Sequence, residues 1–355
     1  MKGLPSSPLI RRVVLWNFKG VKAGELRLAP LTLLVGPNNS GKTTVLEALL
    51  LAPGPHRPTP YGKSALTLLC TLHKTLDSEG HAFILHNYTE SPAGIVVELD
   101  GESLIIRFEL LEGRGRIGVS ATRVRGSVTL SEIPKILERP LKRSLGSIDM
   151  YSIEREGAGS PEALMGEVLL VRPDLVRAAY GFLERRWIEF VNRGVGRRVA
   201  SELSKIIVKG LVDLTLEPFG GGTHALYAYM ADGRRIRLGD LGDGAQVLAV
   251  AMSLFELVKP RILVWDDVEA HMNPSLLAYT AEWIASLVEE GVQVVASTHS
   301  IEAVRLFTGM VGDRAKILLL DLEAGLLRAK ELDSDDVEEL WKAGLDVRSS
   351  GWLLL

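Results

Sequence analysis

The chain has 355 residues, of which 46% are hydrophobic and 24% charged, a balance that excludes a disordered, collagen-like or purely coiled-coil protein. Its 41 basic and 44 acidic residues give a net charge of −3, so the chain as a whole is not a basic nucleic-acid coat protein. The single cysteine, Cys70, excludes a disulfide within the chain and a structural zinc site.

No apolar run approaches the roughly 18 residues of a membrane-spanning helix, and the N-terminus lacks the apolar core of a signal peptide. We therefore expect a cytoplasmic protein with no membrane partner. The length predicts two domains, or one core with a large insertion.

The first half of the chain alternates short apolar runs with turns, which predicts strands around one helix. In chain order we expect strands at residues 9–16, 25–28 and Leu31–Val35, a helix at Lys42–Leu51, and strands at 95–99, 104–110, 117–121 and 128–130. Four prolines within residues 53–60 end the first helix. Residues 131–209 are expected to be mainly helical.

The last third of the chain alternates apolar strands with longer helices. A hairpin is predicted from strands at 225–230 and 235–238. It is followed by a helix at 245–257, strand Ile262–Trp265, helix Pro274–Glu289, a strand at 293–296, a helix at 301–307 and a strand at 316–321. This alternation predicts an α/β fold with a mostly parallel sheet and an antiparallel β portion.

A phosphate-binding loop is the most specific motif. The pattern G-x-x-x-x-G-K-[ST] is filled by Gly36, Pro37, Asn38, Asn39, Ser40, Gly41, Lys42 and Thr43. It follows an apolar strand and opens a helix, as the motif requires. The glycines let backbone N–H groups surround phosphate, and the helix N-terminus adds positive potential. We expect Lys42 to bind the β- and γ-phosphates of ATP, Thr43 to ligate Mg²⁺ and Thr44 to complete the binding set; a Gly-rich turn that binds nothing is the disfavoured alternative.

An acid-tipped strand is the second motif. Strand Ile262–Trp265 is followed by Asp266 and Asp267, which places carboxylates at the edge of an α/β sheet where ligands bind. Asp266 is expected to hold Mg²⁺ through water, and Asp267 to orient the attacking water. Read alone, a strand that ends in Asp is more often a helix cap, but the phosphate loop strengthens the functional interpretation.

Two weaker motifs complete the set. His299 follows another apolar strand and would touch a γ-phosphate, the alternative being that Ser297 or Ser300 simply caps the next helix. A Gly-rich loop opens an apolar helix with Gly242, Asp243 and Gly244. Such a loop is an anion site at a helix N-terminus, unless it is only a turn capped by its aspartate.

The four motifs, in this order, resemble those of ABC-type ATPases, and within them the RecF, SMC and OLD-like branch. Residues 16–20, WNFKG, are similar to the segment that precedes the phosphate loop in that branch, and residues 266–274, DDVEAHMNP, to its D-E-P-E-x-x-L-H-P motif. The resemblance covers about residues 9–52 and 224–345.

The resemblance implies an α/β ABC-type ATPase head built from residues 1–92 and 211–355, with residues 93–210 as a basic insertion of strands and then helices. It implies an ATP-dependent homodimer in which the Gly242–Gly244 loop of each subunit closes on the ATP held by the Lys42 loop of the other. His299 would sense the γ-phosphate. Too few residues follow His299 for a TOPRIM nuclease domain, so none is expected.

The sequence departs from the pattern of the branch at three places. Gly242 stands where relatives place a signature serine, and Asp267 replaces the usual catalytic glutamate, with Glu269 as an alternative base. No glutamine precedes the Gly-rich loop, so the glutamine that the resemblance implies is missing, and His86 or Asn87 are candidates to replace it. We therefore predict slow hydrolysis.

The middle of the chain is locally basic, with 18 basic and 11 acidic residues between Arg114 and Lys209. The basic side chains form two groups: Arg114, Arg116, Arg123, Arg125, Lys135, Arg139, Lys142 and Arg143, then Arg177, Arg185, Arg186, Arg193, Arg197, Arg198, Lys205 and Lys209. Phe182, Trp187 and Phe190 lie among the second group. The segment is either a DNA-binding surface or a solvated helix face with buried aromatics.

Three functions remain open. The chain is an ATPase that acts on DNA in repair or genome maintenance, an ATPase that regulates a protein effector such as a nuclease in a defence system, or an ATP-gated clamp without turnover. A transporter ATPase is disfavoured by the missing glutamine and the long middle segment.

Overall fold

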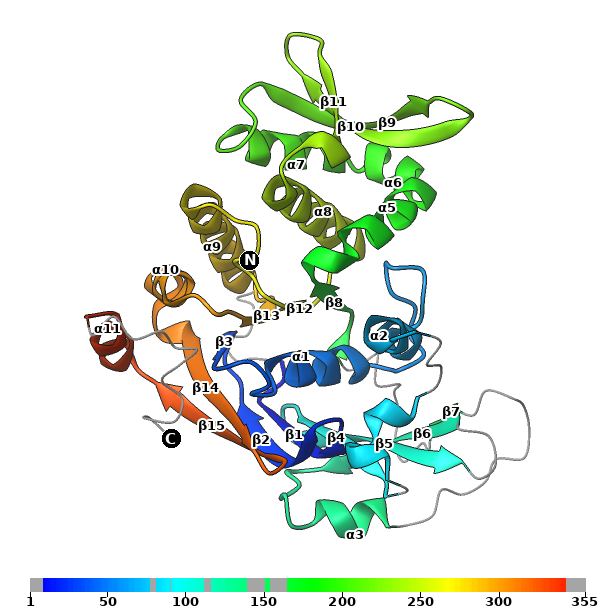
Figure 1. The fold of residues 1–355 in the computed structure, drawn as a ribbon, viewed down its shortest axis with the longest axis vertical. Coiled ribbons are helices and arrows are strands. Elements are labelled where there is room, and N and C mark those ends of the chain that lie inside the picture. The colour runs from blue at the N-terminus through cyan, green and yellow to red at the C-terminus, as the bar shows by residue number, and fades with distance from the viewer. Residues whose placement is uncertain are drawn as a thin grey trace.

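The computed structural model describes residues 9–76, 81–89, 91–111, 116–138, 151–153 and 165–342 and arranges them around one large sheet (Figure 1). In spatial order the described strands of this sheet are β7 (Tyr151–Ile153), β6 (Arg116–Arg125), β5 (Glu102–Leu111), β4 (Ala93–Glu98), β1 (Arg12–Phe18), β2 (Val21–Arg27), β15 (Leu326–Leu332), β14 (Ala315–Glu323), β3 (Leu31–Val35), β13 (Gln293–Ser297), β12 (Ile262–Trp265) and β8 (Val168–Val171).

The sheet has two halves of different character. From β14 through β3, β13 and β12 to β8, all neighbouring strands are parallel. On the other side of the sheet, each strand is antiparallel to its spatial neighbour, in the order β2, β1, β4, β5 and β6. The parallel half brings the carboxyl ends of β3, β12, β13 and β8 to a single edge, and ligands bind at that edge in α/β proteins.

The helices cover both faces of the parallel half. The described α-helices are α1 (Lys42–Leu51), α2 (Ala65–His73), α3 (Ile133–Leu137), α5 (Val176–Arg185), α6 (Trp187–Asn192), α7 (Val195–Ser204), α8 (Asp243–Val258), α9 (Pro274–Glu289), α10 (Ile301–Val311) and α11 (Ser334–Lys342). Short 3₁₀ helices are η1 (Ala82–Ile84), η2 (His86–Tyr88), η3 (Pro173–Leu175), η4 (Leu238–Asp240) and η5 (Gly312–Arg314).

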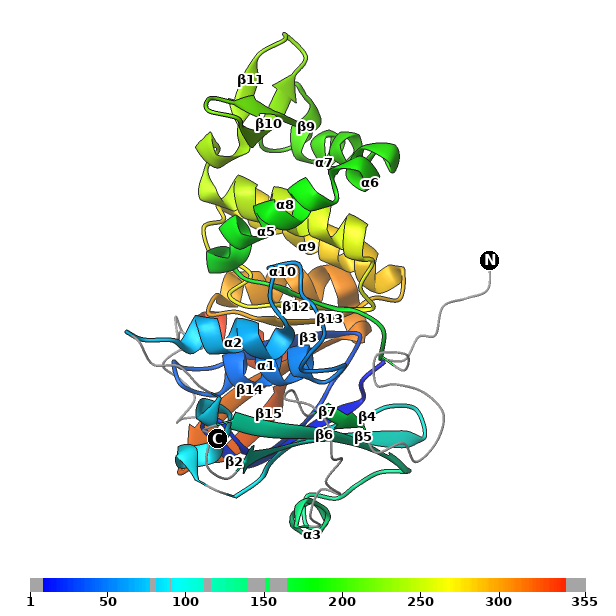
Figure 2. The ribbon, with the colours of Figure 1, turned by 90° about the vertical axis from the view of Figure 1, so that its right-hand side faces the viewer.

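Helix α1 lies between the two halves of the sheet, as Figures 1 and 2 both show. It packs on β8, β12 and β13 with one side. Its residues from Val45 to Leu51 are all buried. Apart from Glu47, these residues are apolar, and a helix with apolar residues on all sides is expected in such an enclosed position. The element that follows the phosphate loop is therefore fixed from several sides.

A second, smaller unit stands above the parallel half in Figure 1. It consists of the antiparallel sheet of β9 (Leu211–Phe219), β10 (Thr223–Met230) and β11 (Arg235–Arg237), with α7 packed on β9. At the contact, a Cβ on Gly196 would lie 2.6 Å from the carbonyl oxygen of Leu214, so only glycine allows this approach. Helix α8 connects the unit to the main sheet through its contacts with α7, α9 and β8.

Trp265 is the largest fully buried side chain and the last residue of β12. Its ring meets that of Trp283 edge-on, with 6.2 Å between the ring centroids, and Trp283 meets Phe255 in the same way at 5.8 Å. These aromatic contacts join β12, α9 and α8 at the residue that precedes Asp266. The acid-tipped strand therefore ends on a rigid support.

The predicted fold class is confirmed: the chain is an α/β protein with a parallel half and an antiparallel portion. One predicted element is wrong. Residues 128–130 form no strand but an irregular segment before α3, and Val128 shares a hydrophobic cluster with Ile133 and Leu137 of that helix. The described part of the stretch 131–209 is mainly helical, as expected, but it also contains the strands β7 and β8. Strand β8 was not foreseen because four apolar residues in a row do not distinguish a buried strand from a buried helix.

The predicted division at residue 93 remains a prediction. In the structure, β4, β5 and β6 continue the sheet that begins with β1 and β2, and β8 is the edge of the parallel half. Residues on both sides of the predicted boundary therefore share one hydrophobic core.

Candidate nucleotide site

The phosphate loop is a tight turn between β3 and α1. Gly36 and Gly41 have φ angles of +138° and +94°, in the region that favours glycine. A Cβ on Gly36 would lie 2.4 Å from the carbonyl oxygen of Leu320 in β14, so the loop rests directly on the neighbouring backbone. No side chain caps the N-terminus of α1, which leaves its first N–H groups for an anion.

Lys42 is folded back over this loop. Its Nζ donates to the carbonyl oxygens of Gly36 and Pro37, at 2.9 Å each, and the residue is only 6% exposed. Burial lowers the pKa of Lys42, while the carboxylates of Asp267, Asp266 and Glu269 oppose the shift. The ammonium group is therefore held where it faces a concentration of negative charge.

Thr43 and Asp266 meet across the edge of the sheet. Thr43 Oγ1 lies 3.1 Å from Asp266 Oδ2 and 3.3 Å from Oδ1. Ser297, at the end of β13, donates its hydroxyl to Asp266 Oδ1 at 2.6 Å and accepts the backbone N–H of Asp267 at 2.8 Å. The phosphate loop and the acid-tipped strand, predicted separately from the sequence, form a single site.

The donor set at this point fits a magnesium ion that is shared with a nucleotide. The oxygens available are one hydroxyl, Thr43 Oγ1, and one carboxylate, Asp266. Mg²⁺ usually takes one or two protein oxygens of this kind and fills its other positions with water and phosphate. Within the described residues no group of three or more His, Cys, Asp or Glu side chains could hold a metal alone. The ion would therefore depend on the nucleotide.

Asp267, Glu269 and His299 form a second layer at the same edge. Asp267 has a φ of +52°, and its Oδ1 lies 3.7 Å from His299 Nε2. Burial and the neighbouring carboxylates of Asp266 and Glu269 raise the pKa of Asp267, against the lowering effect of His299 and Lys42. The side chain of Asp267 is half exposed.

Glu269 is hydrogen-bonded to the backbone of the loop that carries His299. Its Oε1 accepts the backbone N–H of His299 at 2.7 Å. Glu269 Oε2 and His299 Nδ1 are both buried, and neither has a hydrogen-bond partner among the described residues. Ser300 caps α10, as one of the sequence alternatives proposed, whereas Ser297 serves Asp266 and Asp267 instead. One loop therefore provides both Ser300, which caps α10, and His299 at the site.

The Gly-rich loop opens α8, with Gly242 and not Asp243 as the N-cap residue. A Cβ on Gly244 would lie 2.4 Å from the carbonyl oxygen of His271, so the loop packs tightly on the segment after Glu269. Nothing lies within 4 Å of a Cβ on Gly242. In the part of the chain that the structure describes, no hydrogen bond or ion pair joins this loop to the phosphate loop.

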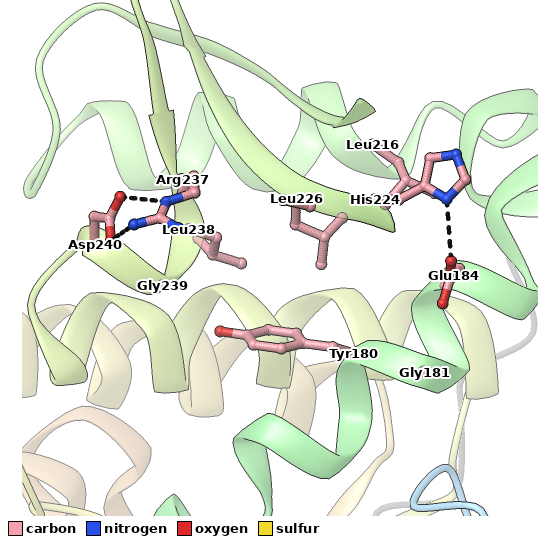
Figure 3. Close-up of a pocket in the computed structure, with 11 residues that line it drawn as sticks. Tyr180, Gly181, Glu184, Leu216, His224, Leu226, Arg237, Leu238, Gly239 and Asp240 are labelled. Carbon is pink, nitrogen blue, oxygen red and sulfur yellow. Dashed lines mark hydrogen bonds and ion pairs between the residues drawn. The ribbon is translucent and has the colours of Figure 1, made fainter. Parts of the chain in front are cut away.

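A cavity of about 360 Å³ lies behind the Gly-rich loop, between α5, the strands β9 and β10, and η4 (Figure 3). Tyr180 forms its floor, and the ion pairs His224–Glu184 and Arg237–Asp240 lie on opposite sides. The Tyr180 hydroxyl donates to Gln246, which in turn donates to the Leu241 carbonyl at 2.6 Å. This wall therefore supports the start of α8.

Arg172 belongs to the site, and sequence reasoning missed it. It directly follows β8, whose last residue, Val171, pairs with Trp265. Arg172 Nη1 consequently lies 3.7 Å from Asp266 Oδ2. The signal was present as the apolar run of β8 followed by Arg-Pro-Asp, but we expected a helix there.

Glu47, in the second turn of α1, is a buried carboxylate bonded by a lysine and a histidine. Lys19 and His73 both bond to it, the latter at 2.7 Å. Burial raises the pKa of Glu47, but the bonds and charges of His73 and Lys19 outweigh it and the pKa falls below the usual value. His86, one candidate for the missing glutamine, bonds to the carbonyl oxygen of Lys19 through Nδ1, and Asn87 bonds to His86. No described hydrogen bond joins either of the two to the Asp266 cluster.

Six of the sixteen basic residues named for the predicted DNA-binding segment have acidic partners in the described structure. The ion pairs are Arg186 and Arg193 with Glu189, Arg197 with Asp213, Arg198 with Glu256, Lys205 with Glu202, and Arg123 with Glu102. Phe190 is buried and stacks on Trp187 with ring centroids 4.7 Å apart. Four of the predicted residues, Arg114, Arg139, Lys142 and Arg143, lie outside the described residues.

The described helices include none with the length and apolar character needed to cross a membrane. The comparison with curated proteins gave no significant match. Among solved structures, an Smc head bound to the C-winged helix domain of ScpA is similar, with a TM-score of 0.56 and 16% identity over 94% of this chain and 100% of that one.

Two Smc heads from Pyrococcus species are similar to the same degree. The head with an extended coiled coil bound to the C-terminal domain of ScpA, derived from Pyrococcus furiosus, gives a TM-score of 0.54 at 14% identity, over 95% and 99% of the two chains. The head with a coiled coil and joint from Pyrococcus yayanosii gives 0.55 at 11% identity, also over 95% and 99%. At these identities the likeness concerns the fold.

A family model matches residues 31–305, from β3 to the first turns of α10. This range contains the phosphate loop, the Gly-rich loop, the acid-tipped strand and His299. Together with the Smc-head fold, the match confirms the predicted resemblance to ABC-type ATPases of the RecF/SMC branch. The chain belongs to the AAA domain family described as putative AbiEii toxin, Type IV TA system.

Proposed function

We propose that the chain binds Mg²⁺–ATP at the edge formed by Lys42, Thr43 and Asp266 and hydrolyses it slowly. The contact between the Thr43 hydroxyl and the Asp266 carboxylate carries this proposal, because it joins a phosphate loop and an acid-tipped strand at hydrogen-bond distance. A magnesium ion held there would neutralise charge on the β- and γ-phosphates.

The protein groups around the phosphates divide the work. Lys42 exchanges its two loop carbonyls for phosphate oxygens. Asp267, half exposed and with a raised pKa, holds the attacking water and accepts its proton. Glu269 positions the His299 backbone and thereby the imidazole beside Asp267. Because an aspartate is one methylene shorter than a glutamate, the water is held less closely, and turnover is slow.

We propose further that ATP closes two chains head to tail. Nothing lies within 4 Å of a Cβ on Gly242, and among the described residues no hydrogen bond or ion pair joins the Gly242–Gly244 loop to the phosphate loop of its own chain. An N–H-rich helix start that is exposed in this way suits the nucleotide of a second copy. The test is light scattering of Asp267→Asn with ATP or ADP: a dimer with ATP alone supports the proposal, and a monomer in both refutes it.

Closure, in this proposal, acts on a protein effector. The family description names a toxin of a Type IV toxin–antitoxin system, and two of the three similar Smc heads were solved with a domain of ScpA, a protein partner. The basic segment offers less to DNA than its charge suggests, because residues such as Arg193 and Arg198 are already paired. Action on DNA remains the second candidate, supported by the excess of basic residues between 114 and 209.

Phosphate release from ATP, measured with and without duplex DNA, separates these functions. Lys42→Ala is the blank, and release by the wild type at the level of this blank would refute the ATPase. Lys42-dependent release that DNA does not change supports a protein effector. Stimulation by DNA would favour the second candidate and would identify the basic segment as its contact.

A further inference from the structure

The guanidinium of Arg172 is held in a fixed orientation. Its Nε and Nη2 donate to Oδ1 and Oδ2 of Asp174, each at 3.0 Å, which is the bidentate geometry that fixes an arginine fork. Asp174 lies in η3, directly after the strand β8, so the two residues form one local unit. The third nitrogen, Nη1, is aimed by this unit toward the nucleotide site.

Nη1 points between two carboxylates without bonding to either. It lies 3.7 Å from Asp266 Oδ2 and 4.0 Å from Glu47 Oε1, both beyond hydrogen-bond distance. Nη1 has no hydrogen-bond acceptor among the described residues and is not sealed from solvent. A charged donor group therefore stands beside the Thr43–Asp266 contact with its N–H groups available.

Phosphate is the ligand chemistry that fits such a group. A guanidinium stays charged at any pH the protein meets, and its planar N–H groups match phosphate oxygens. The magnesium ligands Thr43 and Asp266 lie next to the terminal phosphates of a bound nucleoside triphosphate. We infer that Arg172 binds the terminal phosphate of the nucleotide held by its own chain, and that Asp174 is the positioning residue for it.

This inference rests on the proposed nucleotide site and is tested in the Asp267→Asn background, so that turnover does not consume the ligand. Titration calorimetry with Mg²⁺–ATP and with Mg²⁺–ADP measures the two affinities. For Arg172→Gln we expect the ATP affinity to fall about tenfold or more, since a charge-assisted bond is lost, and the ADP affinity to change less than about twofold. A purely structural role would weaken both ligands equally.

Two further variants keep the test informative if Arg172→Gln folds poorly. Asp174→Asn leaves the arginine in place but loosens its fork, and we expect an intermediate loss that is again specific for ATP. Arg197→Gln is the matched control, because it removes an arginine paired with an aspartate, Asp213, far from the site, and should change neither affinity. Circular dichroism establishes which variants are folded.

The outcomes separate this inference from the function on which it rests. Suppose that Lys42→Ala loses its ATP affinity, whereas the folded variants Arg172→Gln and Asp174→Asn keep the ATP affinity of the Asp267→Asn parent. In that case Arg172 does not contact phosphate and the inference is wrong. An equal loss of ATP and ADP affinity also overturns it. If the Asp267→Asn parent binds no ATP at all, the proposed function fails, and this inference fails with it.

Discussion

Two regions of this molecule are rich in charge, and the structure uses them differently. At the edge of the parallel sheet, charged side chains from separate elements converge, and some of their polar atoms, such as Glu269 Oε2 and Arg172 Nη1, have no hydrogen-bond partner in the described chain. Along α5–α7, basic residues pair with nearby acids, as Arg193 does with Glu189. A charged group that is held in a fixed position without a hydrogen-bond partner can bind a ligand. A paired charge on the surface, in contrast, contributes little to stability.

The strongest test of this contrast is Lys42→Ala. We expect the variant to lose ATP binding and turnover, because the phosphates lose the ammonium group of Lys42, the only buried lysine among the described residues. Arg198→Ala, which removes a cation paired with Glu256, should retain both. Nucleotide binding by calorimetry checks the pair. Equal behaviour of the two variants would remove the distinction between the regions.

Asp267→Asn separates chemistry from binding at the edge of the sheet. We expect turnover to fall by a factor on the order of 10²–10⁴, since the group that accepts the water proton is lost. ATP affinity should be retained, because Lys42, Thr43 and Asp266 are unchanged. Steady-state phosphate release gives the rate and calorimetry the affinity. A variant with wild-type turnover would transfer the role of base to Glu269.

Gly244→Ala tests the close packing of the Gly-rich loop. The added methyl would lie 2.4 Å from the His271 carbonyl oxygen, and we expect a loss of about 1–3 kcal/mol in the free energy of unfolding. Gly239→Ala is the control, since nothing lies within 4 Å of its Cβ. Urea unfolding of both variants measures the difference. A Gly244→Ala variant as stable as the control would show that α8 can shift freely.

Glu47→Gln tests whether a buried carboxylate among cations stabilises the fold. Its pKa is lowered in the folded chain, so its contribution is present above the unfolded value and is lost as the pH falls through the folded one. At pH 7 we expect the variant to be less stable by about 1–3 kcal/mol. Below about pH 4, urea unfolding should give a smaller difference between the wild type and the variant in the free energy of unfolding. A difference independent of pH would contradict the role of the charge.

The smallest effect is expected for the double variant Arg197→Ala, Arg198→Ala. Thermal melting should not distinguish it from the wild type, because exposed ion pairs contribute little. If the chain binds DNA, the salt dependence of binding should also be unchanged, since both cations are engaged with acids. A slope reduced by about one for each lost phosphate contact would show that these pairs open for DNA.

The sequence predicted the parts of the site that a motif carries. Lys42, Thr43 and Asp266 were assigned from their positions after apolar strands, and the structure brings them together. The contribution of Arg172 depends on β8 pairing with β12, and no local pattern encodes the partner of a strand. The pairing of Arg198 with Glu256 could not be predicted for the same reason, because a count of charged residues contains no distances between them.

The aromatic support beside Asp266 has an optical consequence. Trp265 is fully buried, its indole N–H has no acceptor within the described chain, and its neighbour along the backbone is Asp266. The emission of a buried indole responds to nearby charge, so nucleotide and metal arriving at Asp266 would change its fluorescence. A Trp265→Phe variant provides the blank. The fluorescence of Trp265 would therefore report occupancy of the site without an added label, and stopped-flow mixing would follow it in time.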